Sequence, residues 1–354
     1  MFDEIDLKTF GEKIHQLIQG KNLSRKETKD MFCQVLNNTQ PQLQQGALLA
    51  ALTSKGETVE EIAGTWEAIH QLDTAKVQLD ISSPLVENCG TGMDGIKTFN
   101  ISTAAAIIAS ANGIHIARHG ARAITSKCGT VDILQELGIN VECTPETVKK
   151  SIEKCGIGIF NGMSPQIHPN GGLARILSQI RFGTILNIAA SLANPASPTY
   201  AVRGVYSKDK VELVAKVMKE IGYRRAYIVH GLNAAGTKGI DELSTMGENF
   251  VCELKETGEI KKYSFFPQDL GLSQAKESDL SPAENKQKEK DNFLNLISGK
   301  LHGPKQDIIC LNAAAILYIM KKAKDLKEGI EISRKTIETG KALEKLNQWI
   351  DTQN

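Results

Sequence analysis

The stretch from Glu87 to Thr103, ENCGTGMDGIKTFNIST, decides the fold. An extended apolar segment (81–86) precedes it, a glycine-rich turn forms its centre, and an alanine-rich helical run (103–112) follows it. Glycines let backbone N–H groups approach an anion closely, and the N-terminus of the following helix supplies further donors. The Asp94 carboxylate in the turn suits a metal-bridged pyrophosphate. The stretch therefore predicts a phosphate-binding strand–turn–helix unit, although a plain glycine turn before a packed helix has the same pattern.

Length and composition limit the classes of protein that remain. The chain has 354 residues, which favours two domains, and its net charge of +1 gives no overall field that attracts nucleic acid or membranes. Seven scattered cysteines without a CxxC pair argue against a disulfide framework or a zinc site and fit a reducing cytoplasm. The acidic N-terminal stretch is no signal peptide, and no apolar run reaches the roughly 18 residues of a membrane helix. We expect a cytoplasmic protein.

The periodicity of the chain changes near residue 80. Residues 4–75 predict four helices, the second opened by a capping box of Ser24 and Glu27. From about residue 84, short β-rich runs alternate with helices, which predicts an α/β domain with a central mixed, partly parallel sheet. The expected strands are 114–117, 157–160, 226–230, 249–254 and 263–266, and the expected helices are 100–112, 131–137, 144–154, 208–221 and 307–324. Residues 276–291 suggest an exposed connection or frayed helix, and 330–349 a single amphipathic helix.

Two further polar clusters could bind an anion or a metal. Arg118-His119-Gly120-Ala121-Arg122 is followed by residues 126–130 (SKCGT), and cations with small donors at strand ends suit a sugar phosphate. An ordinary basic surface turn would look the same. Asp241 and Glu242 lie in a glycine-flanked loop, where adjacent carboxylates are poor acid–base partners but good Mg²⁺ ligands. The alternative is a helix N-terminus whose acidic residues favour the dipole.

The remaining motifs narrow the chemistry. His168 precedes a proline, which is more typical of a turn than of a catalyst, and unpaired histidines do not favour a His-ligated metal. The sequence has no Gx₄GK[ST] loop, Gly-x-Ser-x-Gly elbow or paired-cysteine site. Jointly, the clusters point to a phosphorylated sugar or nucleotide substrate.

Several long stretches in fixed order resemble anthranilate phosphoribosyltransferases, over about residues 10–350. They are LLAALTSKGETVEEIAG, GTGMDGIKTFNISTAAA, RHGARAITSKCGTVDILQELG, TILNIAASLANPA, GIDELS, FFPQDLGL and LNAAAILY. The resemblance implies a small helical domain used for dimerisation, a large α/β domain, and an active site in the cleft between them. We expect the small domain in residues 1–78, with a helical contribution from about 168–195, and the large domain in residues 79–354. The resemblance also implies that an amine attacks C1 of phosphoribosyl pyrophosphate while Mg²⁺-bound pyrophosphate leaves.

The resemblance assigns roles to matching positions. The donor-side positions that it implies are Gly90, Thr91, Gly92, Asp94, Gly95, Thr98, Asn100, Ser102, Thr103, Arg118, His119, Gly120, Ser126, Lys127, Gly129 and Thr130. Arg118 stands where the family usually has a phosphate-binding lysine. The expected magnesium ligands are Ser102, Asp241 and Glu242, and the acceptor-side positions are Ala121, His168 and Ser178.

The departures from the family pattern fall mostly on the acceptor side. Met93 replaces a glycine of the donor loop, and Ala121 replaces an asparagine that contacts the aromatic acceptor. Leu177 or Ser178 falls where an arginine normally anchors the acceptor carboxylate, and Arg175 or Arg181 could substitute from a neighbouring turn. Ala190-Ser191 replaces Gly-Pro. Lost charge-assisted bonds would cost roughly 1.5–3 kcal/mol each, which predicts an altered preference among acceptors.

The resemblance implies an Mg²⁺-dependent glycosyltransferase of tryptophan biosynthesis. It would move a phosphoribosyl group to anthranilate or a related aromatic amine and would act as a homodimer without nucleic acid or membrane partners. Two alternatives stay open: a non-catalytic nucleic-acid-binding relative, and a pyrimidine-nucleoside phosphorylase of the same architecture. DNA mobility shifts without donor binding would favour the first, and phosphorolysis of thymidine or uridine the second.

Overall fold

The computed structural model describes residues 3–93, 95–122, 129–180 and 182–354. The chain divides into two compact units. A helical unit contains Met1–Lys76 and Gly162–Pro195, and an α/β unit contains Val77–Asn161 and Ala196–Asn354. Among the described residues, none of the helices has the length and apolar character needed to cross a membrane.

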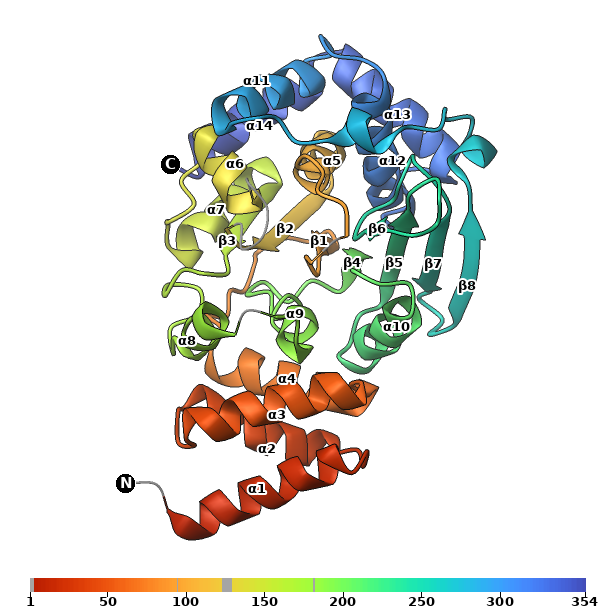
Figure 1. The fold of residues 1–354 in the computed structure, drawn as a ribbon. Coiled ribbons are helices and arrows are strands. Elements are labelled where there is room, and N and C mark those ends of the chain that lie inside the picture. Colours follow the sequence, from red (N-terminus) through yellow and green to blue (C-terminus); the bar gives the residue numbers. More distant parts are fainter. Residues whose placement is uncertain (1–2, 94, 123–128, 181) are drawn as a thin grey trace. The chain divides into compact units, whose positions relative to one another are not determined.

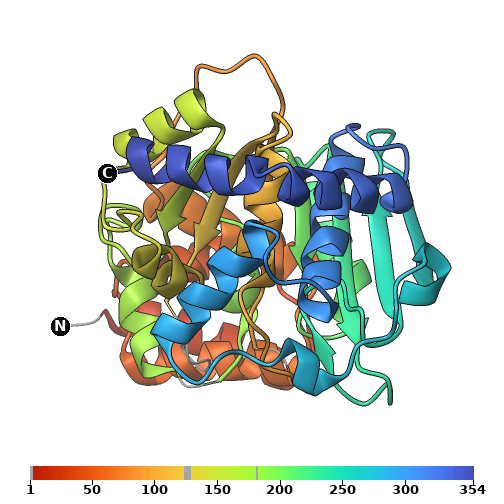
Figure 2. The ribbon, with the colours of Figure 1, turned by 90° about the horizontal axis from the view of Figure 1, so that it is seen from above.

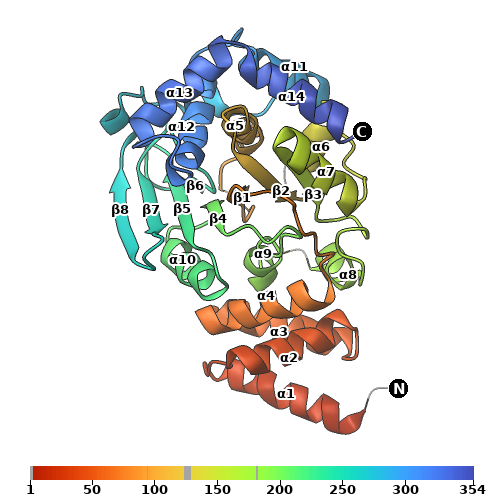
Figure 3. The same ribbon diagram turned by 180° about the vertical axis from the view of Figure 1, so that it is seen from behind.

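The described residues of the helical unit form six helices in two segments of the chain (Figure 3). They are α1 (Glu4–Ile18), α2 (Arg25–Leu36), α3 (Gln42–Lys55), α4 (Val59–Leu72), α8 (Gly172–Gln179) and α9 (Ile185–Ala189). The expected capping box of Ser24 and Glu27 opens α2, and a second one opens α4. Buried Asp73 caps α8 from the first segment, because its carboxylate accepts hydrogen bonds from the backbone N of Asn170 and Leu173 at 2.8 and 3.1 Å.

The α/β unit is built on an eight-stranded mixed sheet (Figure 1). Its strands are β1 (Leu85–Gly90), β2 (His115–Gly120), β3 (Ile157–Asn161), β4 (Tyr200–Gly204), β5 (Arg225–Leu232), β6 (Gly239–Ile240), β7 (Asn249–Leu254) and β8 (Ile260–Phe265). The order is β3-β2-β1-β4-β5-β7-β8, with β6 paired to β5. The first five strands in this order are parallel, and β6, β7 and β8 add antiparallel pairs. The mixed, partly parallel sheet is thus confirmed.

The strand order reverses between β1 and β4. Strands β1, β2 and β3 follow one another toward one edge, whereas β4 and β5 extend toward the other. In open α/β sheets, ligands bind outside the carboxyl ends of the strands at such a switch point. The carboxyl ends of β1 and β4 lie side by side there, with Gly90 paired to Gly204. This edge is therefore the expected ligand-binding edge of the unit.

Helices cover both faces of the sheet. Helices α5 (Ile101–Ser110) and α12 (Pro304–Ile319) lie on one face, and α10 (Lys210–Glu220) lies on the other (Figures 1 and 2). The remaining helices of the unit are α6 (Thr130–Glu136), α7 (Pro145–Cys155), α11 (Lys286–Ile297), α13 (Leu326–Glu338) and α14 (Lys341–Thr352), with short 3₁₀ helices η1 (Pro267–Leu270) and η2 (Glu277–Leu280). Helices α5 and α12 are almost wholly apolar and buried, so they form the centre of the hydrophobic core.

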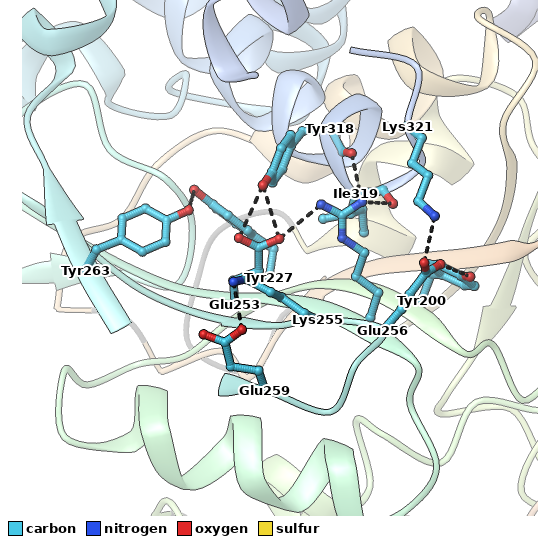
Figure 4. A network of polar contacts seen from close by, with 11 residues as sticks. Tyr200, Tyr227, Glu253, Lys255, Glu256, Glu259, Tyr263, Tyr318, Ile319 and Lys321 are labelled. Carbon is cyan, nitrogen blue, oxygen red and sulfur yellow. Dashed lines mark hydrogen bonds and ion pairs between the residues drawn. The ribbon is translucent and has the colours of Figure 1, made fainter. Parts of the chain in front are cut away.

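A polar network anchors the end of α12 to the sheet (Figure 4). Glu253 on β7 accepts hydrogen bonds from the Tyr318 hydroxyl at 3.2 Å and from Arg225 at 3.0 Å. Arg225 also donates to the carbonyl of Ile319 at 2.9 Å, where α12 ends. The Glu253 carboxylate and the Arg225 guanidinium thus bond each other, and Arg225 also bonds a carbonyl at the end of α12 that has no partner within the helix. These bonds fix the end of α12 relative to the sheet.

Three local expectations were incomplete or wrong. Strand β4 was not predicted, because Arg203 interrupts its apolar run; in the fold this arginine is fully buried beside Glu87. The single helix expected at 330–349 is two helices, α13 and α14, separated at Gly340 with φ of 77°. Residues 276–291 are ordered in η2 and the start of α11, where buried Glu289 accepts a hydrogen bond from the backbone of Ala283 at 2.6 Å.

Candidate functional site

The acidic pair lies at the switch point of the sheet. Asp241 follows β6 and is buried against the carboxyl ends of β1 and β4. A Cβ atom at Gly90 would lie 1.8 Å from Oδ2 of Asp241, and one at Gly204 would lie 1.4 Å from its carbonyl oxygen. Only glycine fits at these two paired positions, because a side chain at Gly90 would displace the Asp241 carboxylate and one at Gly204 would displace the Asp241 backbone. The sequence of both strand ends is thus adapted to the position of Asp241.

The glycine-rich loop is hydrogen-bonded to the acidic loop. The backbone N of Gly92 donates to Oδ2 of Asp241 at 2.7 Å, and the backbone N of Gly95 donates to the carbonyl of Gly239 at 3.1 Å. Thr91 fixes the start of the turn, since its hydroxyl accepts from the backbone N of Tyr206 at 3.0 Å. Two clusters that lie about 150 residues apart in the sequence therefore form one site.

Ser102 links the second carboxylate to a buried cation. The backbone N of Ser102, in the first turn of α5, donates to Oε1 of Glu242 at 2.9 Å. Its hydroxyl accepts from Nη2 of Arg118 at 3.1 Å. Arg118 is 2% exposed, and its Nε and Nη1 atoms have no partner among the described residues. Unpaired buried donors of this kind are costly, so the site favours an added anion such as a phosphate oxygen.

Burial controls the charges of this cluster. Burial raises the pKa of the Glu242 carboxyl well above its ordinary value, and the negative charge of Asp241 raises it further. Hydrogen bonds from Ser102 and the positive charge of Arg118 lower this pKa, but they do not offset the rise. Burial also lowers the pKa of the Arg118 guanidinium to about 10, which leaves it charged at neutral pH. A buried carboxyl whose pKa is raised in this way next to a second carboxylate is stabilised in its charged form by a further positive charge. The pair is therefore suited to a cation.

The oxygen donors fit a divalent cation. Both carboxylates and Ser102 line a small cavity of about 20 Å³, and the buried Oδ1 atom of Asn88, which also lines it, has no partner among the described residues. In the part of the chain that the structure describes, His, Cys, Asp and Glu do not gather in threes as a metal-binding group. A cation bound by Asp241 and Glu242 would share these two carboxylates with other oxygen ligands, which is the pattern typical of Mg²⁺ with a phosphorylated substrate.

The donor loop contains an unusual backbone conformation. Met93 has φ of 70°, and Gly92 before it has φ of 71°. This region favours glycine, and a side chain there costs about 1–2 kcal/mol. The Met93 side chain is exposed. The glycine that the resemblance places at this position would adopt the turn without that cost.

The other donor-side positions group around β2 and α6. His119 and Gly120 end β2, and a Cβ atom at Gly120 would lie 3.2 Å from the Thr130 side chain at the start of α6. Gly129 donates through its backbone N to Asp132 at 2.9 Å. Thr98, Asn100 and Thr103 lie before or within the first turn of α5. Three predicted residues, Asp94, Ser126 and Lys127, lie outside the described residues.

The acceptor-side positions belong to different units. Ala121 follows β2 in the α/β unit, whereas His168 and Ser178 belong to the helical unit. Buried His168 contacts the carbonyl of Asp73 through Nδ1, which must carry the proton, and burial lowers its pKa. The Ser178 hydroxyl donates to the carbonyl of Arg175 within α8 at 2.8 Å.

Arg175 has a structural role in the helical unit. Its guanidinium donates to Gln45 at 2.8 Å and to the carbonyl of Val35 at 2.6 Å, which joins α8 to α2 and α3. These bonds argue against Arg175 as a substitute for the missing carboxylate anchor. Arg181, the other suggested substitute, lies outside the described residues.

Sequence reasoning missed two buried polar groups next to the acidic pair. Asn312 on α12 accepts from the backbone N of Leu243 at 3.0 Å and donates to its carbonyl at 2.9 Å. Asn88 on β1 donates to the carbonyl of Ser102 at 2.7 Å. A buried asparagine in the middle of a strand or helix was the available signal, since buried amides need partners.

Comparison with known proteins identifies the family. Residues 82–343 match the α/β domain of the glycosyl transferase family, and residues 12–72 match its helical bundle domain. The chain is 40% identical to the anthranilate phosphoribosyltransferase of Thermoanaerobacter sp., over 97% of this chain and 98% of that protein. The enzyme of that name from Methanosarcina acetivorans is 37% identical over 97% of this chain and 90% of its own.

The chain belongs to the anthranilate phosphoribosyltransferase family. Members of this family are glycosyltransferases, so the predicted enzyme class is confirmed. The crystal structure of the Thermus thermophilus anthranilate phosphoribosyltransferase superposes with a TM-score of 0.86 at 30% identity, covering 96% of this chain and 98% of that one. The Saccharomyces cerevisiae enzyme in complex with PRPP (phosphoribosyl pyrophosphate) and Mg has a TM-score of 0.85 at 25% identity, covering 99% and 98%. The predicted combination of a helical and an α/β domain is also confirmed.

Proposed function

We propose that this chain transfers the phosphoribosyl group of phosphoribosyl pyrophosphate to an aromatic amine of the anthranilate class and releases pyrophosphate. One observation supports phosphoribosyl pyrophosphate as the donor. Asp241 is hydrogen-bonded to the glycine-rich loop, and Glu242 is hydrogen-bonded to the start of α5. The yeast relative, whose structure contains PRPP and Mg, supports the same choice of donor and of Mg²⁺. Another structure of the yeast enzyme contains 4-fluoroanthranilate. That chain is 24% identical to this one, so its likeness supports the fold and not the acceptor.

The residues of the site would act by binding and orienting the donor. The Arg118 guanidinium, whose Nε and Nη1 atoms have no partner among the described residues, would hold phosphate oxygens, while Asp241, Glu242 and Ser102 would hold Mg²⁺. Bound Mg²⁺ would neutralise the negative charge of the leaving pyrophosphate. The amine nitrogen forms a bond to C1 of the ribose, the bond from C1 to the pyrophosphate oxygen breaks, and the amine loses a proton. Positioning and electrostatic stabilisation then supply most of the rate enhancement.

A pyrophosphate-release assay tests this function. Purified protein is mixed with phosphoribosyl pyrophosphate, Mg²⁺ and either anthranilate or a ring-substituted analogue. We expect release that depends on the amine and is lost in the Asp241→Asn, Glu242→Gln double variant. The Glu259→Gln variant, which changes an exposed carboxylate of the β7–β8 turn, should match the parent. Donor binding without release for any aromatic amine would contradict the proposal.

The acceptor preference is part of the same proposal. Ala121 stands where the resemblance places an asparagine, and the Arg175 guanidinium is already bonded to Gln45 and Val35. Fewer hydrogen-bond donors are therefore left for the carboxylate of an acceptor. We therefore propose a weaker preference for anthranilate over amines that lack the carboxylate. Steady-state KM values for anthranilate and for such amines measure this preference, and a KM for anthranilate at least a hundredfold lower would refute it.

We also propose a homodimer formed through the helical unit. Ile5 and Ile18 on α1 and Leu43 on α3 are exposed apolar side chains, and α1 packs against α3. Exposed large apolar residues in one unit are typical of an interface. Light scattering after size-exclusion chromatography should give twice the chain mass, and Leu43→Lys should give the monomer mass. A monomeric parent protein would contradict this part of the proposal.

A further inference from the structure

We propose that Asn88 is a positioning residue of the acidic pair, which acts through one buried water molecule between its Oδ1 atom and the Glu242 carboxylate. This inference rests on the proposed role of Asp241 and Glu242 in holding a divalent cation. Asn88 lies in β1, two residues before Gly90, and is 3% exposed. Its side chain lines the same cavity as both carboxylates.

The orientation of the Asn88 amide is fixed by one hydrogen bond. Nδ2 donates to the carbonyl of Ser102 at 2.7 Å, and a carbonyl oxygen can only accept. The amide oxygen is therefore Oδ1, and this atom has no partner among the described residues. A buried acceptor without a partner costs about 1–3 kcal/mol, so a guest with an O–H or N–H donor is favoured at this position.

The cavity has the size and lining for one water molecule. Its volume of about 20 Å³ exceeds the roughly 10–15 Å³ that a water needs. Asn88, Ser102, Glu242 and Asn312 supply polar lining, and Val202 and Val229 supply apolar walls. The cavity thus has both the room and the hydrogen-bonding groups for one water molecule beside Asn88.

A bound water would fix Glu242 from a second side. The Ser102 N–H already holds Oε1 of Glu242, and Asn312 already holds both backbone polar groups of the next residue, Leu243. Asn312 also donates to the carbonyl of Ile308 within α12 at 2.9 Å. With the water in the cavity, the carboxylate would be held in the orientation that a cation requires. Groups that orient metal ligands in this way typically contribute 10–100-fold to metal affinity.

Two measurements test the inference. A high-resolution crystal structure of the parent protein should show a water within hydrogen-bonding distance of Asn88 Oδ1 and Glu242. Electron paramagnetic resonance with Mn²⁺ alone, as the probe of the acidic pair, should show about tenfold weaker binding for Asn88→Val. Ser110→Ala is the matched control, because Ser110 is another buried residue whose hydroxyl lacks a partner among the described residues. Its Mn²⁺ affinity should equal that of the parent.

The outcomes separate this inference from the proposed function. A dry cavity in the parent crystal, or unchanged Mn²⁺ affinity in folded Asn88→Val, overturns the role of Asn88 and leaves the acidic pair in place. Unchanged Mn²⁺ affinity in the Asp241→Asn, Glu242→Gln variant would overturn both. A purely structural role of the Asn88–Ser102 hydrogen bond would lower the melting temperature without changing Mn²⁺ affinity, and this result too would overturn the inference. The crystal structure decides the question if Asn88→Val does not fold.

Discussion

The carboxylate of Asp241 occupies the space that a side chain at Gly90 would need. Its Oδ2 atom lies 1.8 Å from the position of a Cβ at Gly90, and it accepts a hydrogen bond from Gly92 at 2.7 Å. The last residue of β1 and the first acidic residue after β6 are therefore adapted to each other.

A methyl group at Gly90 should abolish most of the activity without unfolding the protein. In Gly90→Ala the new Cβ displaces the Asp241 carboxylate, and a shift of about 1 Å in such a group costs roughly 100-fold in kcat/KM. Steady-state kinetics and circular dichroism measure the two effects. Gly46→Ala on α3 is the control, because a Cβ there meets nothing within 4 Å. Equal kinetics for the two variants would show that Asp241 tolerates displacement.

Replacement of Met93 by glycine should tighten donor binding. The φ of 70° costs a side chain about 1–2 kcal/mol, and glycine adopts this conformation freely. We expect Met93→Gly to bind phosphoribosyl pyrophosphate with Mg²⁺ several-fold more tightly by calorimetry. Met93→Ala keeps the Cβ and the backbone strain, so it should resemble the parent. If alanine improves affinity as much as glycine does, the length of the methionine side chain is the cause instead.

Loss of the Gln353 side chain should destabilise the α/β unit. This buried amide accepts from the backbone N of Ile159 at 3.2 Å and donates to its carbonyl at 3.2 Å, and it also accepts from Trp349 at 2.7 Å. It thereby pairs the free side of the edge strand β3. Gln353→Ala should lower the free energy of unfolding by about 2 kcal/mol in urea titrations. Gln348→Ala, at an exposed position of α14, should change it by less than about 0.5 kcal/mol.

The stability of the helical unit should depend on pH through Glu27. Hydrogen bonds from Lys13 and then from Ser24 lower the pKa of this carboxyl to about 2. A lowered pKa means that the ionised form stabilises the fold above about pH 4.5, and that this contribution is lost as the pH falls toward 2. Glu27→Gln should therefore be less stable than the parent at pH 6, and the difference should disappear near pH 2. Denaturant titrations across this range measure the difference.

A control substitution identifies the cause of that pH dependence. Glu12→Gln, at an exposed position of α1, should leave the pH profile of the parent unchanged. A stability difference between Glu27→Gln and the parent that stays constant from pH 6 to pH 2 would assign the effect to the capping geometry rather than to the charge.

Local patterns predicted the parts of the site that lie close together in sequence. The glycine-rich turn, the Arg118 cluster and the Asp241-Glu242 pair were each recognisable, because their residue types match the ligands they suit. Their meeting at one sheet edge depends on strand order, which follows from packing across the whole unit. Asn88 and Asn312 were missed because a single asparagine carries no spacing pattern. The domain boundaries and residue roles remain predictions.

The buried pair of Glu87 and Arg203 restricts how the sheet can change during evolution. The two side chains come from adjacent strands, β1 and β4, and are fully buried. The Glu87 carboxylate also accepts a hydrogen bond from the Tyr223 hydroxyl at 2.7 Å. Loss of either charge alone would cost about 3–5 kcal/mol, because the other would stay buried without compensation. Single substitutions at these positions are therefore unfavourable intermediates. Among relatives, the two positions should covary, changing together to another matched pair.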